Sequence, residues 1–262
     1  MIPKVNKVKE RLGKGGVSLG ATVFIASPEI VEMVGNAGYD FVWIDCEHGS
    51  FYLETAVQMI RAAEASNVTP VVRVPDHDPS FIMRILDAGA IGVIIPGITT
   101  KEQAQASISA AKYSPQGVRG ACPNIRAAGH RAQNWPEFVR WSNENIMVWL
   151  LVEGVDGVAN FDRIIEVKGI DAVIMGPFDL SQSMGYPGQV THPEVVEKLE
   201  DMIKKARAKR IQVAAVIFNT DLENIKKDAR HWVDLGCRIL IAGADKGILA
   251  AGFNSIPAHL KF

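Results

Sequence analysis

Eight short apolar runs, separated by longer amphipathic stretches, are the feature that most narrows the folds open to this chain. The runs are VSLGATVFI (from Val17), FVWIDCE (from Phe41), TPVVRVP (from Thr69), IGVIIPG (from Ile91), IMVWLLVE (from Ile146), DAVIMGP (from Asp171), QVAAVIF (from Gln212) and RILIAG (from Arg238). They are too uniformly apolar to alternate cleanly, which is typical of parallel strands covered on both faces. The intervening stretches carry helix signals, such as the N-cap pairs Ser27-Pro28 and Asp78-Pro79 and the helical spacing of apolar residues from about Leu53 to Ala65. This repeat predicts an α/β fold of the (β/α)8 TIM-barrel type, with a doubly wound sheet as the alternative.

Length and composition are consistent with one barrel. The chain has 262 residues, 48% of them apolar and 22% charged, which excludes a disordered chain. Barrels of about 250 residues commonly fold as one unit, so we expect a single domain over residues 1–262. An irregular stretch rich in proline and glycine, from Ser114 to about Gln133, precedes an extra helix near Trp135. We therefore predict a loop and helix insertion after the fourth helical stretch. Long loops inside compact domains are usually functional or mobile.

Charge and cysteine content exclude several classes of partner. The 28 basic and 29 acidic side chains give a net charge of −1, which provides no field for nucleic acid or anionic lipid. No apolar run approaches the roughly 20 residues that cross a bilayer, and the first residues lack the apolar core of a secretory signal. Cys46, Cys122 and Cys237 are too few and scattered for a disulfide framework or a zinc site. We therefore expect a cytoplasmic protein without nucleic-acid or membrane partners.

The residues that close the apolar runs are the candidates for chemistry, because TIM-barrel active sites lie at the carboxyl ends of the strands. Glu153 and Asp179 close consecutive runs, so their carboxylates are candidates for a shared ion. Two carboxylates with positions left for water and substrate suit Mg²⁺ or Mn²⁺. The structural alternative is that each residue only caps the helix or turn that follows.

A second group of polar residues lies at the ends of the second and third runs. Arg73 interrupts an apolar run, where an unpaired guanidinium would be costly. It therefore needs either an anionic ligand or a structural ion pair with Asp45 or Glu47. His48 follows Glu47 directly and is a candidate general base oriented by a carboxylate. No run contains a lysine, which argues against a Schiff-base enzyme and leaves only Lys246, just past the last run.

The motifs, taken in order, resemble those of the HpcH/HpaI aldolase family, the metal-dependent class II pyruvate aldolases. The resemblance extends from about Val17 to Gly252. Its carriers are GATVFIASPEIVE, DFVWIDCEHG, VVRVP, LDAGAIGVIIPGI, GVRG, VEGVDGVANFDRI, GPFDLSQSMG and GADKGILAAG. Each motif alone is weak, but DCEHG followed by VRVP and GPFDLS in this order is specific.

The resemblance implies roles for the acidic residues and for the histidine. Glu153 and Asp179 match the ligands of a divalent cation, which would be Mg²⁺, Mn²⁺ or Co²⁺. His48 matches the catalytic histidine, and Asp45 and Asp87 match acidic partners that orient this histidine or its water.

The resemblance also implies how a substrate is held. Arg73 matches the arginine that holds the pyruvate oxygen and stabilises the enolate. The segment Gly176, Pro177, Phe178 and Asp179 matches the site of the pyruvate carboxylate, through backbone N–H groups around Phe178 and Asp179. The implied reaction is cleavage or formation of a 4-hydroxy-2-oxo acid from pyruvate and an aldehyde, in a homo-oligomer (trimer or hexamer) that exchanges a terminal helix between subunits.

Two departures from the family pattern bear on the substrate. Leu151 stands where many members have a glutamine that contacts pyruvate, and Arg126 is the candidate for the arginine common in the unusual loop ACPNIRAAGHRAQNW. A decarboxylase of oxaloacetate or another 2-oxo acid remains an alternative, because it passes through the same enolate. A metabolite-binding barrel without turnover is the other alternative, and Leu151 is its only support.

Overall fold

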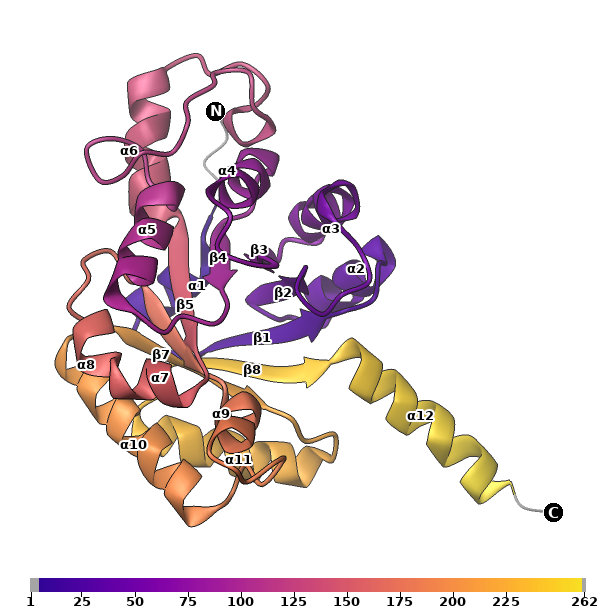
Figure 1. The fold of residues 1–262 in the computed structure, drawn as a ribbon. Coiled ribbons are helices and arrows are strands. Elements are labelled where there is room, and N and C mark those ends of the chain that lie inside the picture. Colours follow the sequence, from indigo (N-terminus) through magenta and orange to yellow (C-terminus); the bar gives the residue numbers. More distant parts are fainter. Residues whose placement is uncertain (1–4, 261–262) are drawn as a thin grey trace.

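The eight predicted strands form a closed parallel barrel in chain order, so the predicted (β/α)8 fold is confirmed (Figure 1). The structure is a computed structural model that describes residues 5–260. The strands are β1 (Ser18–Val23), β2 (Phe41–Asp45), β3 (Thr69–Arg73), β4 (Gly92–Ile95), β5 (Met147–Val152), β6 (Ala172–Met175), β7 (Gln212–Ile217) and β8 (Ile239–Ala244). Seven strands lie within their apolar runs and β8 extends one residue beyond its run, which confirms that the runs are buried parallel strands.

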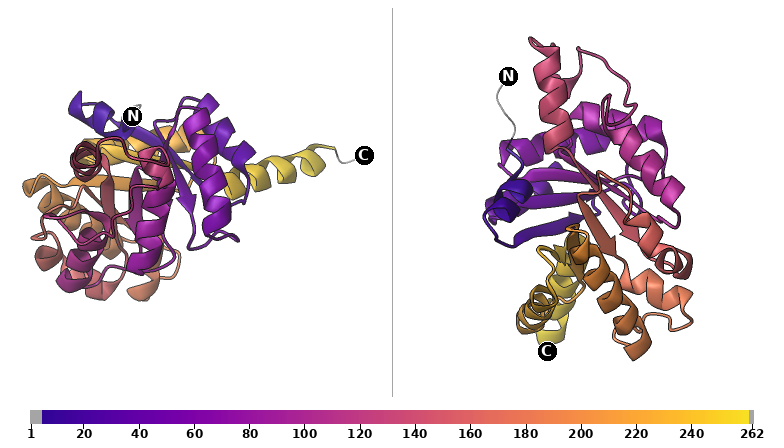
Figure 2. Two further views of the ribbon diagram at one scale, coloured as in Figure 1. Left: turned by 90° about the horizontal axis from the view of Figure 1, so that it is seen from above. Right: turned by 90° about the vertical axis from the view of Figure 1, so that its left-hand side faces the viewer.

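Most of the helices lie around the outside of the barrel (Figure 2). The helices within residues 5–260 are α1 (Lys7–Gly13), α2 (Pro28–Asn36), α3 (Leu53–Ala65), α4 (Pro79–Ala88), α5 (Lys101–Ala111), α6 (Trp135–Asn145), α7 (Val155–Ala159), α8 (Phe161–Ile164), α9 (Pro177–Ser183), α10 (Pro193–Ala208), α11 (Leu222–Leu235) and α12 (Asp245–His259). Ser27 and Asp78 cap α2 and α4 through their side chains, as their positions before proline predict. None of the helices within residues 5–260 is long and apolar enough to cross a membrane.

Two apolar layers explain why the strands show no simple alternation. One layer fills the barrel interior and includes Phe41, Trp43, Trp149 and Leu151, together with Val8 of α1. The other layer lies between the outer faces of the strands and the helices. All six residues of β5 are buried, because successive side chains enter the two layers in turn.

The predicted insertion of a loop and a helix is present, because the loop lies between α5 and α6 and the helix near Trp135 is α6. The loop packs at the amino-terminal end of the barrel and contains the short 3-10 helix η1 (Arg126–Ala128). Arg126 donates to Glu64 at the end of α3 and to the carbonyl oxygen of Ala88 at the end of α4. Because both helices end just before their next strands begin, this loop lies opposite the carboxyl ends of the strands.

Helix α12 leaves the barrel and projects away from it (Figures 1 and 2). Asp245 is the first residue of this helix, and its buried carboxylate accepts hydrogen bonds from the backbone N–H groups of Phe24 and Ile25. These bonds anchor the start of the helix to the end of β1. Beyond that point the helix exposes large apolar side chains, namely Ile248, Leu249, Phe253 and Ile256. No segment within residues 5–260 buries these four side chains.

Candidate active site

Asp45, the last residue of β2, organises the first part of the site. It is fully buried, and its Oδ1 accepts the backbone N–H groups of Glu47 at 3.1 Å and His48 at 2.9 Å. Its Oδ2 accepts two bonds from Arg73, which is the direct register partner of Asp45 on β3. Asp45 therefore fixes both the turn that carries Glu47 and His48 and the guanidinium beside it.

Arg73 lies between two carboxylates and an aromatic ring. Its Nη1 is 2.7 Å from Glu47 Oε2, and its guanidinium lies 5.0 Å from the centre of the Trp43 ring. The side chain is only 8% exposed, so the ion pair is shielded from water. Arg73 thus forms the predicted structural ion pairs, and it forms them with both candidate partners, Asp45 and Glu47. These ion pairs hold the guanidinium at the carboxyl ends of the strands.

Glu153 and Asp179 lie at the ends of the neighbouring strands β5 and β6. Burial and, next in size, the negative charge of Asp179 raise the pKa of Glu153 to about 7. Glu47 also contributes to this shift, whereas a backbone N–H bond from Gly97, at 2.9 Å from Glu153 Oε1, opposes it. Burial likewise raises the pKa of Glu47, and Asp179 adds to that effect. Glu47, Glu153 and Asp179 therefore share one electrostatic environment.

Gly176 makes room for the Glu153 side chain. A Cβ atom at this position would lie 2.6 Å from Glu153 Cβ and 3.0 Å from Glu153 Oε2, distances that real atoms avoid. Pro177, which is buried, begins α9 and fixes the start of the turn that presents Asp179. Phe178 is exposed at the same turn. The glycine and proline of GPFDLS thus have a steric reason in this structure.

His48 lies at the edge of this group. Its side chain is 67% exposed, and its Nε2 is 3.9 Å from Glu47 Oε2. Asp45 holds His48 through the backbone N–H rather than through the ring. The imidazole is therefore open to water and to a substrate.

The structure does not bring Asp87 together with His48 in one chain. Asp87 lies in the last turn of α4, which runs from the carboxyl end of β3 back to the start of β4. It is therefore at the opposite end of the barrel, where its Oδ1 accepts a bond of 2.6 Å from Arg119. Arg126 lies at that end too, paired with Glu64. Neither residue reaches the carboxylates of the site within this chain.

The donor set fits a hard divalent cation. Asp45 and Glu47 flank the guanidinium of Arg73, and Glu153 and Asp179 interact electrostatically with each other and with Glu47, which leaves an excess of negative charge. Carboxylate oxygens are the ligands that Mg²⁺ and Mn²⁺ prefer. Within residues 5–260 no group of three or more histidine, cysteine or acidic side chains is arranged to hold a metal ion. A cation at Glu153 and Asp179 would therefore keep several positions for water or substrate.

Two features of the site escaped the sequence analysis. Glu47 was expected only as an ion-pair partner of Arg73, yet it shares the electrostatic environment of Glu153 and Asp179. Its place between Asp45 and His48 in the DCEHG motif is the sequence signal that could have identified this role. Gly97 carries no such signal, because only the fold brings its N–H group to Glu153.

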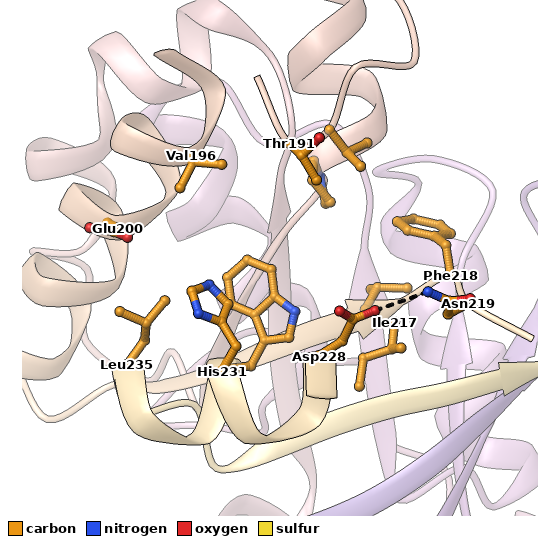
Figure 3. A pocket seen from close by; sticks show the side chains of 13 residues that line it. Thr191, Val196, Glu200, Ile217, Phe218, Asn219, Asp228, His231 and Leu235 are labelled. Carbon is orange, nitrogen blue, oxygen red and sulfur yellow. Dashed lines mark hydrogen bonds between the residues drawn. The ribbon is translucent and has the colours of Figure 1, made fainter. Parts of the chain in front are cut away.

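The floor of the site is apolar, and a separate cavity lies to one side. Leu151 is buried in the barrel interior beside other apolar side chains. A cavity of about 480 Å³ lies between α10, α11 and the end of β7 (Figure 3). Of the residues predicted for the site, only Pro177 lines this cavity. The cavity also has polar side chains, among them Asn219, whose Nδ2 donates a hydrogen bond of 3.3 Å to Asp228 Oδ2. None of the predicted carboxylates lines this cavity.

Comparison with known proteins gives the family. The sequence model of the HpcH/HpaI aldolase/citrate lyase family matches residues 21–241. A hydroxypyruvate/pyruvate aldolase of Pseudomonas aeruginosa is 33% identical over 260 residues, covering 98% of this chain and 93% of the relative. A 5-keto-4-deoxy-D-glucarate aldolase of Salmonella arizonae is 32% identical, with 98% and 97% covered. The crystal structure of the citrate synthase SbnG is 31% identical and superposes with a TM-score of 0.86 over 96% of each chain. The predicted enzyme class, a lyase of the aldolase type, is confirmed, and the chain belongs to the HpcH/HpaI aldolase/citrate lyase family.

Proposed function

We propose that this protein is a divalent-cation-dependent class II aldolase that cleaves or forms 4-hydroxy-2-oxo acids, with pyruvate as the donor and an aldehyde as the acceptor. The observation that carries the proposal is the excess of carboxylate beside the buried guanidinium of Arg73 at the carboxyl ends of β2, β3, β5 and β6. The aldolases to which the chain is similar, among them one named for hydroxypyruvate and pyruvate, support the substrate class.

Glu153 and Asp179 would hold the cation, as Mg²⁺, Mn²⁺ or Co²⁺. When bound, a divalent cation acts as a Lewis acid that polarises the carbonyl oxygen of a 2-oxo acid. Glu47 adds negative charge nearby and keeps Arg73 in place. Gly176 leaves the space in which the Glu153 carboxylate lies.

The other residues would orient the donor and move its proton. Arg73 is placed to stabilise negative charge on the enolate oxygen, because its guanidinium is fixed and shielded from water. His48 is placed to accept or return a proton at C3 through a water molecule, since its ring is exposed at the edge of the site. The N–H groups of Phe178 and Asp179 lie in the first turn of α9, where they have no partner within the helix, and would take the pyruvate carboxylate.

The test is product analysis by NMR with Mg²⁺ and, separately, with EDTA. We expect a 4-hydroxy-2-oxo acid to give pyruvate and an aldehyde with Mg²⁺ and neither product with EDTA. Pyruvate formed from oxaloacetate, with the hydroxy-oxo acids left intact, would identify a decarboxylase instead. An absence of turnover on every oxo acid despite bound metal would identify a binding protein.

We also propose that the protein is a homo-oligomer, a trimer or a hexamer, in which α12 packs on another subunit. The exposed apolar residues of α12 and a cavity of about 290 Å³ at its base, lined by Ile30, Met33 and Val34, support this proposal. Light scattering of the wild type and of Phe253→Asp tests it. We expect the wild type to be an oligomer and the variant a smaller species, whereas a monomeric wild type would contradict the proposal.

A further inference from the structure

One peptide group, between Pro96 and Gly97, lies between a histidine and a candidate metal ligand. His77 Nε2 is 2.6 Å from the carbonyl oxygen of Pro96, and the N–H group of Gly97 donates to Glu153 Oε1 at 2.9 Å. The carbonyl and the N–H belong to the same planar unit, so neither turns without the other. The contact at one end of the unit therefore sets the direction of the bond at the other end.

The direction of the first bond follows from its acceptor. A carbonyl oxygen only accepts, so His77 carries its proton on Nε2 and donates it to Pro96. Donation to the carbonyl also polarises the peptide and strengthens the donor at its N–H end.

The peptide depends on these contacts because its surroundings hold it weakly. It follows the last residue of β4, and Pro96 contributes no N–H group to a strand pairing. Gly97 has a φ of +58°, in the left-handed region that glycine enters freely along with many other conformations. The next peptide is fixed by the bond from Ile98 N–H to the carbonyl oxygen of Leu151, at 3.0 Å. Within residues 5–260, the hydrogen bonds to His77 and Glu153 are the ones that hold the Pro96–Gly97 unit.

His77 itself is well anchored in the loop between β3 and α4. On one side, Asp76 accepts the N–H of Asp78 at 2.8 Å. On the other side, Asp78 caps α4 by accepting the N–H groups of Ser80 and Phe81. The histidine is half-buried between these turns, so its ring is presented in a fixed place.

We propose that His77 is a positioning residue for Glu153, acting through the Pro96–Gly97 peptide. The Gly97 N–H group occupies Glu153 Oε1, which fixes the plane of the carboxylate and leaves Oε2 for a cation. The connection runs across the ends of three consecutive strands, from β3 through β4 to β5. This inference rests on the proposed metal site, and it adds a residue that touches neither the metal nor the substrate.

The test is the affinity of the full-length protein for Mn²⁺ alone, measured from the EPR signal of free Mn²⁺ without any substrate. We expect His77→Ala to raise the Kd about tenfold, as removal of residues that orient metal ligands commonly does. His77→Gln places an amide nitrogen near the position of Nε2 and should restore an affinity close to wild type. His77→Asn, whose amide is too short to reach Pro96, should behave like His77→Ala.

Asn134→Ala is the structural control, because it removes the side-chain cap of α6, a helix that carries none of the proposed site residues, without touching the loop that holds His77. It should lower the melting temperature in EDTA by about 2–4 °C and leave the Mn²⁺ affinity unchanged. A wild-type Kd in His77→Ala, or no recovery in His77→Gln, would overturn the role of His77 while leaving the metal site intact. A wild-type protein that binds no Mn²⁺ would overturn the metal site and this inference with it.

Discussion

The two ends of the barrel use the same charged residue types in opposite ways. At the amino-terminal end, acidic side chains are matched with lysine or arginine. These ion pairs are Lys9–Asp171, Arg11–Asp40, Arg119–Asp87 and Arg126–Glu64. At the carboxyl end, Asp45 and Glu47 share the guanidinium of Arg73, and within residues 5–260 neither Glu153 nor Asp179 forms an ion pair.

The comparison distinguishes acidic residues that stabilise the fold from acidic residues that are available to bind a ligand. Paired carboxylates at the amino-terminal end fasten helices and loops to the barrel and have no charge left for a ligand. At the carboxyl end, burial first and then repulsion between the carboxylates of Glu153 and Asp179 raise the pKa of Glu153. A cation relieves that repulsion, so the unpaired end is where binding and chemistry are expected.

The strongest way to break this comparison is to remove the unpaired carboxylates. Glu153→Ala and Asp179→Ala should each abolish Mn²⁺ binding and lower kcat/KM for aldol cleavage by about 10³-fold or more, because the cation supplies several kcal/mol of transition-state stabilisation. Mn²⁺ titration and steady-state kinetics measure both effects. Retention of tight Mn²⁺ binding in both variants would show that these residues are not the ligands.

A second variant separates proton transfer from metal binding at the same end. His48→Ala should leave Mn²⁺ bound and lower turnover by between about 10²-fold and 10⁴-fold, the range typical of a lost general acid or base. The Mn²⁺ titration serves as the internal control, because His48 is not a ligand in this account. Full activity of His48→Ala would show that the proton is moved by another group.

The pH dependence of metal binding sharpens the contrast further. Burial and Asp179 raise the pKa of Glu153 from its ordinary 4.5 to about 7, so between these values the metal-free folded protein holds a proton that the unfolded chain lacks. The metal-free protein should therefore lose stability as the pH rises through that window. A cation displaces the same proton, so the Kd for Mn²⁺ should fall about tenfold per pH unit up to about pH 7 and then level off. Titrations from pH 5 to 8, with melts in EDTA, measure both trends, and a Kd independent of pH would contradict the shift.

The smallest effect on the metal site should come from the paired end. Asp40 accepts the N–H of Leu19 at 2.9 Å and pairs with Arg11. Asp40→Ala should cost about 1–3 kcal/mol of unfolding free energy, because it removes the acceptor of a partly buried hydrogen bond and leaves Arg11 without its partner. The Mn²⁺ affinity should not change. Urea unfolding and Mn²⁺ titration provide the two readouts, and a weakened Mn²⁺ affinity would show that the two ends are coupled.

The fold was accessible from sequence because local patterns determine it. Eight apolar runs became eight strands, and the helical spacing from Leu53 to Ala65 matches α3 at both ends. The cap at Asp78 was readable for the same reason, since a capping side chain bonds to residues two and three positions away. Such patterns report contacts that are close along the chain.

The site was only partly accessible, because its geometry depends on contacts between distant segments. Asp45, Arg73, Glu153 and Asp179 were found from their places at strand ends, and the structure gathers them. Asp87 was matched by motif alone, and the path of α4 carries it to the opposite end of the barrel. The position of a residue within a sequence motif does not show at which end of the barrel that residue lies. The approach of Gly97 to Glu153 depends on strand register and loop shape, which no local pattern reveals.

Deuterium exchange into the methyl group of pyruvate in D₂O, followed by NMR with Mg²⁺ and again with EDTA, tests the central claim most directly. It needs no knowledge of the aldehyde, because it detects removal of the C3 proton alone. The account predicts exchange that requires the cation, is lost in Glu153→Ala and is strongly slowed in His48→Ala. Equal exchange in EDTA, or no exchange by wild-type protein with the cation bound, would contradict it.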